Sequence, residues 1–253
     1  MKYYPTLAKK PSFTLNDAIA IIGSKESASK ALNSMIRNGS VHRIRNNLYT
    51  CFNFNAGDDY ASRFQIATRI NEDSFIGFHS AFEFRGFYNQ TFFEMQVCSS
   101  KKFSPFEYEG YRYKWFLSPS PIQIENIQNI RVTTIERTIV DSIRMLGKAI
   151  GMEELVQCLN LIHEVNEDKI LEMLSIYNQE RLYRKVGYVL SFYKSTLSLS
   201  EEFFNSCKAK GVLSNKGYLV NSDKENLVFD STWGLYAYGN LKHLTSKGGE
   251  FDV

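Results

Sequence analysis

The chain has 253 residues with 43% hydrophobic and 23% charged side chains, an ordinary globular composition that allows a buried core. No apolar run reaches the roughly 18 residues of a membrane span, and the N-terminus lacks the apolar segment of a secretory signal, so we expect a cytoplasmic protein with no membrane partner. The formal net charge of +3 is too small for a surface that binds polyanions everywhere, and any nucleic-acid site must therefore be local.

The chain opens with signals for two short helices. "TLNDAIAIIG" predicts a helix that is capped by Thr14, has Asp17 in its first turn and stops at Gly23. Ser24 is expected to cap a second helix, which ends at Asn38-Gly39. Its apolar residues recur at the spacing of one buried helix face, and they are Ala28, Ala31, Leu32, Met35 and Ile36.

A basic hairpin is predicted directly after the second helix. "SVHRIRNNLYT" turns at Asn46-Asn47, because asparagine tolerates positive φ better than most residues. The helix face opposite the apolar stripe is polar and basic, and so is the hairpin. Serine and asparagine can hydrogen-bond phosphates or base edges, and lysine and arginine release counterions from DNA. The expected DNA contacts are Lys25, Ser27, Ser29, Lys30, Asn33, Arg37, Arg43, Arg45 and Asn46.

Helix, helix and basic hairpin in this order indicate a winged helix-turn-helix, with the second helix entering the major groove and the hairpin lying on the neighbouring backbone. The alternative is a solvated helix face and a charged hairpin that contact nothing. "NFNAGDD" (residues 53–59) is a polar stretch that predicts a linker. We therefore expect a winged helix-turn-helix domain at 1–53 and a larger mixed α+β domain at 54–253, an α+β fold in all.

Strands and helices alternate in the predicted larger domain before helices dominate from Thr134 onward. Helices are expected near 60–70 and 79–86, strands near 74–78, 92–98, 111–117 and 131–133, four helices between 134 and 193, and a strand pair in 227–241. Basic residues at the strands are candidates for secondary DNA contacts if they face the same way as the winged helix. They are Lys101, Lys102, Arg112 and Lys114.

"VTTIERTIVDSI" begins one of these helices and has a structural interpretation. Thr133 and Glu136 predict a capping box, and Arg137 and Asp141 lie at i, i+4 and can pair on one face. The motif is therefore explained by a correctly started helix rather than by catalysis. His79 is likewise expected to be a buried hydrogen-bonding residue rather than a ligand or a base.

The block "DAIAIIGSKESASKALNSMIRNGSVHRIRNNLY" resembles the N-terminal winged helix of AbiEi-type antitoxins, in which two helices precede "G-x-L-x-R-x-x-R-G-V-Y". Asn46 and Asn47 stand where that pattern has arginine and glycine. The positions of the pattern are occupied here by Gly39, Val41, Arg43, Asn46, Asn47, Leu48 and Tyr49. Four later segments resemble further motifs of the family, namely "FHSAFEFRGF", "VTTIERTIVDSI", "RKVGYVL" and "STWGLYAYGNL".

This resemblance implies an autorepressor that binds inverted repeats in double-stranded operator DNA of its own bacterial operon. It also implies an antitoxin that counters a nucleotidyltransferase-like toxin in abortive infection by phage. A defence-associated regulator without antitoxin activity is the first alternative, and a DNA-processing nuclease is the second. A neighbouring gene for a nucleotidyltransferase would favour the antitoxin.

Enzymatic motifs are weak in this sequence. A phosphate-binding P-loop is absent, and "GSKES" (residues 23–27) is followed by no acidic pair that could hold a metal. "EDK" (residues 167–169) is the nearest match to a nuclease motif, but it begins an amphipathic helix, where acidic residues suit the positive end of the dipole. The four cysteines and four histidines are scattered. We expect no catalytic residue, no cofactor and no metal.

Overall fold

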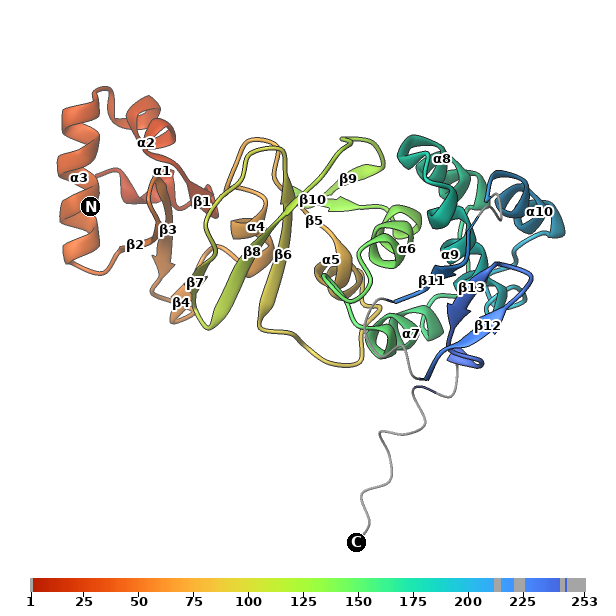
Figure 1. Ribbon diagram of the computed structural model, residues 1–253. Helices are drawn as coiled ribbons and strands as arrows, with labels where there is room; N and C mark the ends of the chain where they lie inside the picture. The colour runs from red at the N-terminus through yellow and green to blue at the C-terminus, as the bar shows by residue number, and fades with distance from the viewer. Residues whose placement is uncertain (1, 212–214, 221–225, 242–243, 245–253) are drawn as a thin grey trace, which may run out of the picture. The chain divides into compact units, whose positions relative to one another are not determined.

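The computed structural model describes residues 2–211, 215–220, 226–241 and 244, and it shows a mixed α+β chain, as the sequence predicts. The chain divides into two compact units, each built from two separate segments (Figure 1). The first unit comprises Met1–Ile76 and Phe92–Val132, and the second comprises Gly77–Thr91 and Thr133–Val253. These units do not coincide with the predicted domains 1–53 and 54–253, since the first unit joins the N-terminal elements to a sheet from later residues.

The first unit begins with the two predicted helices and the predicted hairpin. Thr14 Oγ1 accepts a hydrogen bond from the Asp17 amide at 3.2 Å, and Gly23 ends the helix at a φ of 111°. Asn47, at a φ of 61°, makes the turn of the hairpin. The elements are α1 (Tyr4–Leu7), β1 (Ser12–Phe13), α2 (Leu15–Ile22), α3 (Lys25–Arg37), β2 (Val41–Arg45) and β3 (Leu48–Asn53), with β1 and β2 pairing on either side of β3.

The apolar stripe of α3 packs into a small core shared with α2 and the hairpin. Ala28, Leu32 and Met35 are buried there, together with Phe13 of β1 and Tyr49 of β3. The rings of Phe13 and Tyr49 stack at a centroid distance of 5.8 Å. This core confirms the predicted helix face and leaves the opposite side of α3 to solvent.

Residues 53–59 form a tight hairpin, so the predicted linker is wrong. Strand β4 (Asp58–Asp59) pairs antiparallel with the end of β3. The Gly57 amide donates to the Asn53 carbonyl at 2.8 Å, and Gly57 has a φ of 73°. Asparagine and glycine are common in turns as well as in linkers, because both tolerate left-handed backbone. The composition of this stretch therefore could not separate the two.

A six-stranded mixed sheet makes up the rest of the first unit. Its order is β7-β8-β6-β5-β10-β9, with β8 parallel to β6, β5 antiparallel to β6, and β10 parallel to β5. The bounds are α4 (Arg63–Ala67), β5 (Phe75–Ile76), β6 (Glu94–Ser99), β7 (Phe106–Tyr108), β8 (Tyr111–Leu117), β9 (Ile124–Ile127) and β10 (Ile130–Thr133). Strands β7 and β9, at the two edges, were not predicted, and α4 is shorter than predicted.

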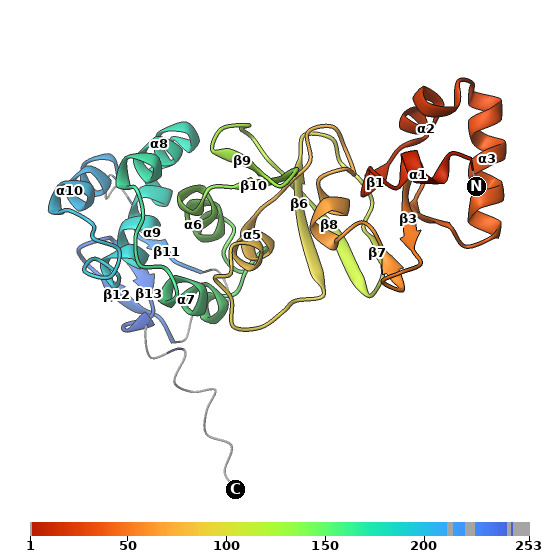
Figure 2. The same cartoon turned by 180° about the vertical axis from the view of Figure 1, so that it is seen from behind.

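Helices dominate the second unit, as expected. Helix α5 lies beside α6 in both views (Figures 1 and 2), and all the residues of α6 from Glu136 to Ile143 are buried. The helices are α5 (Phe78–Phe84), α6 (Ile135–Arg144), α7 (Met152–Asn160), α8 (Glu167–Tyr177), α9 (Glu180–Ser191) and α10 (Glu201–Lys210). The predicted strand pair is present as β12 (Val228–Asp230) and β13 (Leu235–Ala237), and β11 (Gly217–Tyr218) pairs with β13.

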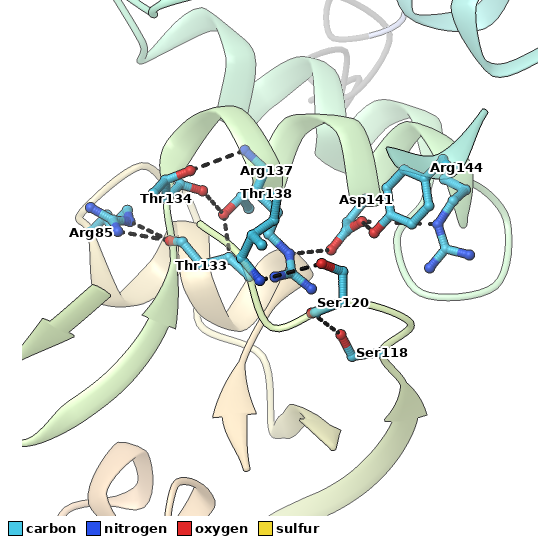
Figure 3. Close-up of polar contacts among 11 residues, drawn as sticks. Arg85, Ser118, Ser120, Thr133, Thr134, Arg137, Thr138, Asp141 and Arg144 are labelled. Atoms are coloured by element: carbon cyan, nitrogen blue, oxygen red, sulfur yellow. Dashed lines mark hydrogen bonds and ion pairs between the residues drawn. The ribbon is translucent and has the colours of Figure 1, made fainter. Parts of the chain in front are cut away.

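The start of α6 lies one residue later than predicted. Thr134 is the cap, and its Oγ1 accepts from the Arg137 amide at 3.3 Å, whereas Thr133 is the last residue of β10 (Figure 3). The predicted capping box of Thr133 and Glu136 is therefore wrong. Strand pairing holds Thr133 in β10, and the Glu136 carboxylate accepts from the Asn166 amide at 3.0 Å instead.

The predicted i, i+4 pair of Arg137 and Asp141 is confirmed. Arg137 Nε lies 3.3 Å from Asp141 Oδ2, and both side chains are buried (Figure 3). Tyr177 donates to the other carboxylate oxygen of Asp141. The motif thus anchors α6 inside the second unit, which agrees with its structural interpretation.

Four free cysteines, Cys51, Cys98, Cys158 and Cys207, are all buried. Burial raises the pKa of Cys51, Cys158 and Cys207 to about 12. Among the described residues, no helix is both long and apolar enough to span a membrane.

Candidate nucleic-acid interface

The solvent side of α3 carries the polar and basic residues that the sequence predicts. Lys25, Ser27, Lys30, Asn33 and Arg37 are exposed, and Ser29 is half-buried. Lys30 Nζ lies 2.7 Å from Glu26 Oε1, but both side chains are more than three-quarters exposed, at 76% and 78%. Such an exposed pair is weak and separates readily. Lys30 therefore remains available to an anion.

A hollow of about 260 Å³ lies between α3 and the hairpin. Ser29 and Asn33 of α3 line it from one side, and Arg43 and Asn46 line it from the other. Arg43 Nη2 donates to Asn46 Oδ1 at 3.1 Å, so the hairpin side of the hollow is organised before any ligand binds. The structure thus brings together four of the nine predicted contacts on one side of α3.

Two further residues line this hollow, although the sequence did not predict them as contacts. Asn47 Oδ1 accepts from the Leu15 amide at 3.0 Å and so ties the tip of the hairpin to the start of α2. Tyr49 lines the hollow, and its ring centroid lies 5.9 Å from the Arg43 guanidinium. Neither contact could be predicted from the spacing of residues along the sequence, because each joins residues that lie close only in the folded hairpin.

Arg45 stands apart from the other hairpin residues. Its guanidinium lies 4.9 Å from the ring centroid of Phe106 and 5.4 Å from that of Phe103, and burial lowers its pKa. Arg43 and Arg45 would share a face of a regular strand, but the pairing of β2 with β3 shifts between them. The bulge turns Arg45 toward the rings, where it packs the hairpin against the sheet.

The four predicted secondary contacts do not form one patch. Lys102 Nζ lies 5.8 Å from the Trp115 ring, whereas Lys114 Nζ lies 5.3 Å from the Phe116 ring. Successive strand residues point to opposite faces, so Lys102 and Lys114 cover opposite faces of the sheet. Arg112 pairs in register with Glu94 at the start of β6, and Lys101 follows the end of that strand. Lys114 also lies 3.5 Å from Glu94 Oε1.

Two basic residues of α9 bind main-chain carbonyls of the segments that follow α10. The buried Arg184 donates to the carbonyls of Asn215 and Gly234 at 2.8 and 3.3 Å. Lys185 Nζ donates to the Leu219 carbonyl at 2.6 Å. Burial, followed by the charge of Arg181, lowers the pKa of Lys185 to about 8.

His79 and the "EDK" stretch, which were considered as catalytic candidates, both make structural contacts. His79 is 3% exposed and its Nδ1 contacts the Glu154 carboxylate. In the "EDK" stretch, the Glu167 carboxylate accepts from the Ser200 amide at 2.9 Å and from the Ser200 hydroxyl at 2.8 Å. Within the described ranges, no group of three or more histidines, cysteines and carboxylates is placed to hold a metal ion.

Comparisons with known proteins give a fold and no family. No family model matches the sequence, and no curated protein matches it at a significant level. Among solved structures, the fold is similar to that of the RV2827C protein from Mycobacterium tuberculosis, with a TM-score of 0.70 and 12% sequence identity. The similarity covers 98% of this chain and 93% of that chain. At this identity the two proteins share an architecture over nearly their whole length.

Proposed function

We propose that this protein is a DNA-binding transcriptional autorepressor. Helices α2 and α3 and the β2–β3 hairpin act as a winged helix-turn-helix, with α3 as the recognition helix. The observation that carries the proposal is the hollow where Ser29 and Asn33 of α3 meet Arg43 and Asn46 of the hairpin. Polar groups that read or position DNA are gathered there from two elements around one concave surface.

The chemistry of this surface suits duplex DNA. A major groove about 12 Å wide admits one helix, whose serine and asparagine side chains can reach base edges or phosphates. Lys30 and Arg37 lie on the exposed side of the same helix, where they can neutralise phosphates and release counterions. Arg43 on the adjacent hairpin can contact the backbone next to the groove.

The second part of the proposal rests on the resemblance to AbiEi-type antitoxins. Under it, the protein works in the bacterial cytoplasm, binds inverted repeats before its own operon and counters a nucleotidyltransferase-like toxin. The buried positions of Arg137 and Asp141 support a scaffolding role for the motif that most resembles the family. The proposal assigns no catalytic residue, cofactor or metal to this chain.

DNA binding is tested with Lys30→Ala and Arg37→Ala against a duplex from the region before the gene. Neither side chain contributes to the buried core, so we expect folded variants with weaker binding. Each lost phosphate contact should flatten the slope of log affinity against log salt by about one. Lys148→Ala, which removes an exposed lysine of the second unit, is the control. Unchanged affinity and slope in both α3 variants would contradict this interface.

Antitoxin activity is tested by placing the nucleotidyltransferase-like toxin gene, which the proposal requires beside this gene, under an inducible promoter that this protein cannot repress. Growth of cells that co-express the wild-type chain then measures neutralisation alone. We expect growth to be restored by the wild type and also by Arg37→Ala. No rescue by the wild-type chain would leave a regulator without antitoxin activity.

A further inference from the structure

A second hollow of the first unit shares no residue with the proposed recognition surface. It has a volume of about 400 Å³, within the usual range of small-molecule sites of about 300–1,000 Å³. Three parts of the unit line it, namely the segment before β1, the end of α4 with the turn after it, and the β9–β10 hairpin. Four of its residues are cationic, and these are Lys9, Lys10, Arg69 and Arg131.

The cations of this hollow are only partly neutralised by the protein. Lys10 and Arg69 share one carboxylate, Asp17, at 2.5 and 3.0 Å. Arg131 Nη1 donates at 2.9 Å to the main-chain carbonyl of Glu72, which is the single carboxylate residue among those that line the hollow. Burial opposes the shift, but hydrogen bonds from Ser100 and, more weakly, the charge of Arg131 lower the pKa of the neighbouring Asp73.

Lys9 carries the clearest surplus of charge. It is exposed, and it forms no hydrogen bond or ion pair with any residue that the structure describes. The other three cations each contact a protein oxygen beside the same space. Fixed cations that keep free donor groups are the usual surroundings of a bound phosphate.

Ser12 provides a second and independent sign of a ligand. This residue lines the hollow and is only 5% exposed, yet its hydroxyl has no hydrogen-bond partner in the described part of the chain. Leaving a buried hydroxyl unpaired is unfavourable, so such groups are normally satisfied. A ligand oxygen would satisfy it.

We propose that this hollow binds phosphate groups, either of a free nucleotide-sized polyphosphate or of a nucleic-acid backbone. The four cations neutralise the phosphate oxygens, and the Ser12 hydroxyl donates a hydrogen bond to one of them. Amide side chains at the rim, on Gln65, Asn126 and Asn129, add uncharged donors. The site does not depend on α3 being a recognition helix.

Two probes and two variants test the proposal in the full-length protein. The probes are inorganic tripolyphosphate, measured by calorimetry, and a mixed-sequence DNA duplex, measured by fluorescence anisotropy. Lys9→Gln removes the unpaired charge, and Ser12→Ala removes the buried hydroxyl. Lys148→Gln removes one exposed charge elsewhere as the matched control. We expect Lys9→Gln to weaken binding about threefold or more, and Ser12→Ala about tenfold, the usual effect of one hydrogen bond to a charged group.

The two probes distinguish the sources of the phosphate. A loss for tripolyphosphate alone assigns the site to a free ligand, and a loss for DNA, with or without tripolyphosphate, assigns it to the backbone. The proposal stands if both variants weaken the binding of the same probe relative to Lys148→Gln, and it is overturned otherwise. Arg43→Ala, measured in parallel, should weaken DNA binding and leave tripolyphosphate unchanged. A failure of the proposed DNA interface is therefore visible separately from a failure of this site.

Discussion

Arg137 is the largest fully buried side chain among the described residues, and a carboxylate of the same helix compensates its charge. Asp141 faces it at 3.3 Å from the next turn of α6. A buried ion pair is costly to form, but removing one partner is worse, because the other charge is left without compensation. The stability of the second unit is therefore sensitive to this pair.

Replacing Arg137 with methionine tests that dependence. We expect Arg137→Met to lower the free energy of unfolding by about 3–5 kcal/mol, because the buried Asp141 carboxylate loses the guanidinium and keeps the Tyr177 hydroxyl and, at 3.9 Å, Arg144. Urea titration followed by circular dichroism measures the loss. The double variant Arg137→Met with Asp141→Asn should recover part of it, and Arg181→Met, at an exposed position of α9, should have little effect. An Arg137→Met protein as stable as the wild type would show that Tyr177 and Arg144 suffice for this carboxylate.

Gly187 of α9 is a second position where one atom matters. A Cβ added there would overlap the ring of Trp233, which is 4% exposed. Alanine favours a helix by up to about 1 kcal/mol over glycine, but overpacking typically costs about 1–3 kcal/mol. We expect Gly187→Ala to lower the urea midpoint and to change the tryptophan fluorescence. Gly239→Ala, where a Cβ meets open space, is the control and should change neither.

The α6 cap lies one residue later than predicted because the sequence cannot distinguish two neighbouring candidates. Thr133 and Thr134 are adjacent hydroxyl residues before the same apolar pattern, so either could cap the helix. In the fold Thr133 ends β10, whose Val132 pairs with Ile76 of β5, so Thr133 lies on the strand side. By contrast, the Arg137–Asp141 pair follows from helical spacing alone and was predictable.

At the scale of elements, the β2–β3 hairpin separates two arginines that the sequence analysis treated alike. Arg43 is exposed beside α3, whereas Arg45 packs over Phe106 and Phe103. We expect Arg43→Ala to weaken DNA binding at unchanged stability. Arg45→Ala should instead lower stability by about 1 kcal/mol, the range of a partly buried cation–π contact. Anisotropy titrations and thermal melts of both variants separate the roles. The reverse assignment of effects would mean that Arg45 leaves the rings when DNA binds.

Helix α2 depends on a carboxylate whose titration can be observed. Burial opposes the effect, but hydrogen bonds from Lys10 and Thr14 lower the pKa of Asp17 to about 2. A carboxylate with a lowered pKa stabilises the fold above its unfolded pKa of about 3.9, and this contribution is lost as the pH falls through about 2. Melting temperatures measured between pH 6 and pH 2 should therefore fall more steeply below pH 4 for the wild type than for Asp17→Asn. Parallel curves would exclude Asp17 as a source of acid sensitivity.

The sequence predicted element bounds most closely for helices with a cap, a stop and an apolar stripe. Helices α2 and α3 have all three, and their bounds agree with the prediction. Strands β7 and β9 were missed because three or four residues, "FEY" and "IENI", are too short to show an alternating pattern. They form the two edges of the sheet, where pairing on one side comes from tertiary context.

For the whole molecule, the path of the chain explains why the predicted boundary after residue 53 and the compact units differ. The chain passes from one unit to the other after Ile76, Thr91 and Val132. At Val132 the passage falls within β10, which ends at Thr133, and Thr134 already caps α6. No run of glycine, proline or serine accompanies these passages, so composition gives no signal for them.

A chain truncated to residues 61–253 should therefore fold less stably than the full chain. The cut removes Asp59, the hydrogen-bond partner of Tyr108, and Arg45, which covers Phe103 and Phe106. We expect the truncated chain to bind anilinonaphthalene sulfonate strongly and to melt at a lower temperature than the full chain. Dye fluorescence and calorimetry measure both effects. Equal melting temperatures and no dye binding would restore the boundary after residue 53.

The four buried cysteines can report how often each unit opens. A thiol reagent attacks the thiolate, and burial of all four thiols keeps the reagent away from them in the native state. Burial also raises the pKa of Cys51, Cys158 and Cys207 to about 12, which makes their thiolates scarce. Modification must therefore wait until the surrounding structure opens. Cys51 and Cys98 report the first unit, and Cys158 and Cys207 report the second. Labelling rates read by mass spectrometry would thus follow the opening of the two units separately, in one protein that carries no substitution.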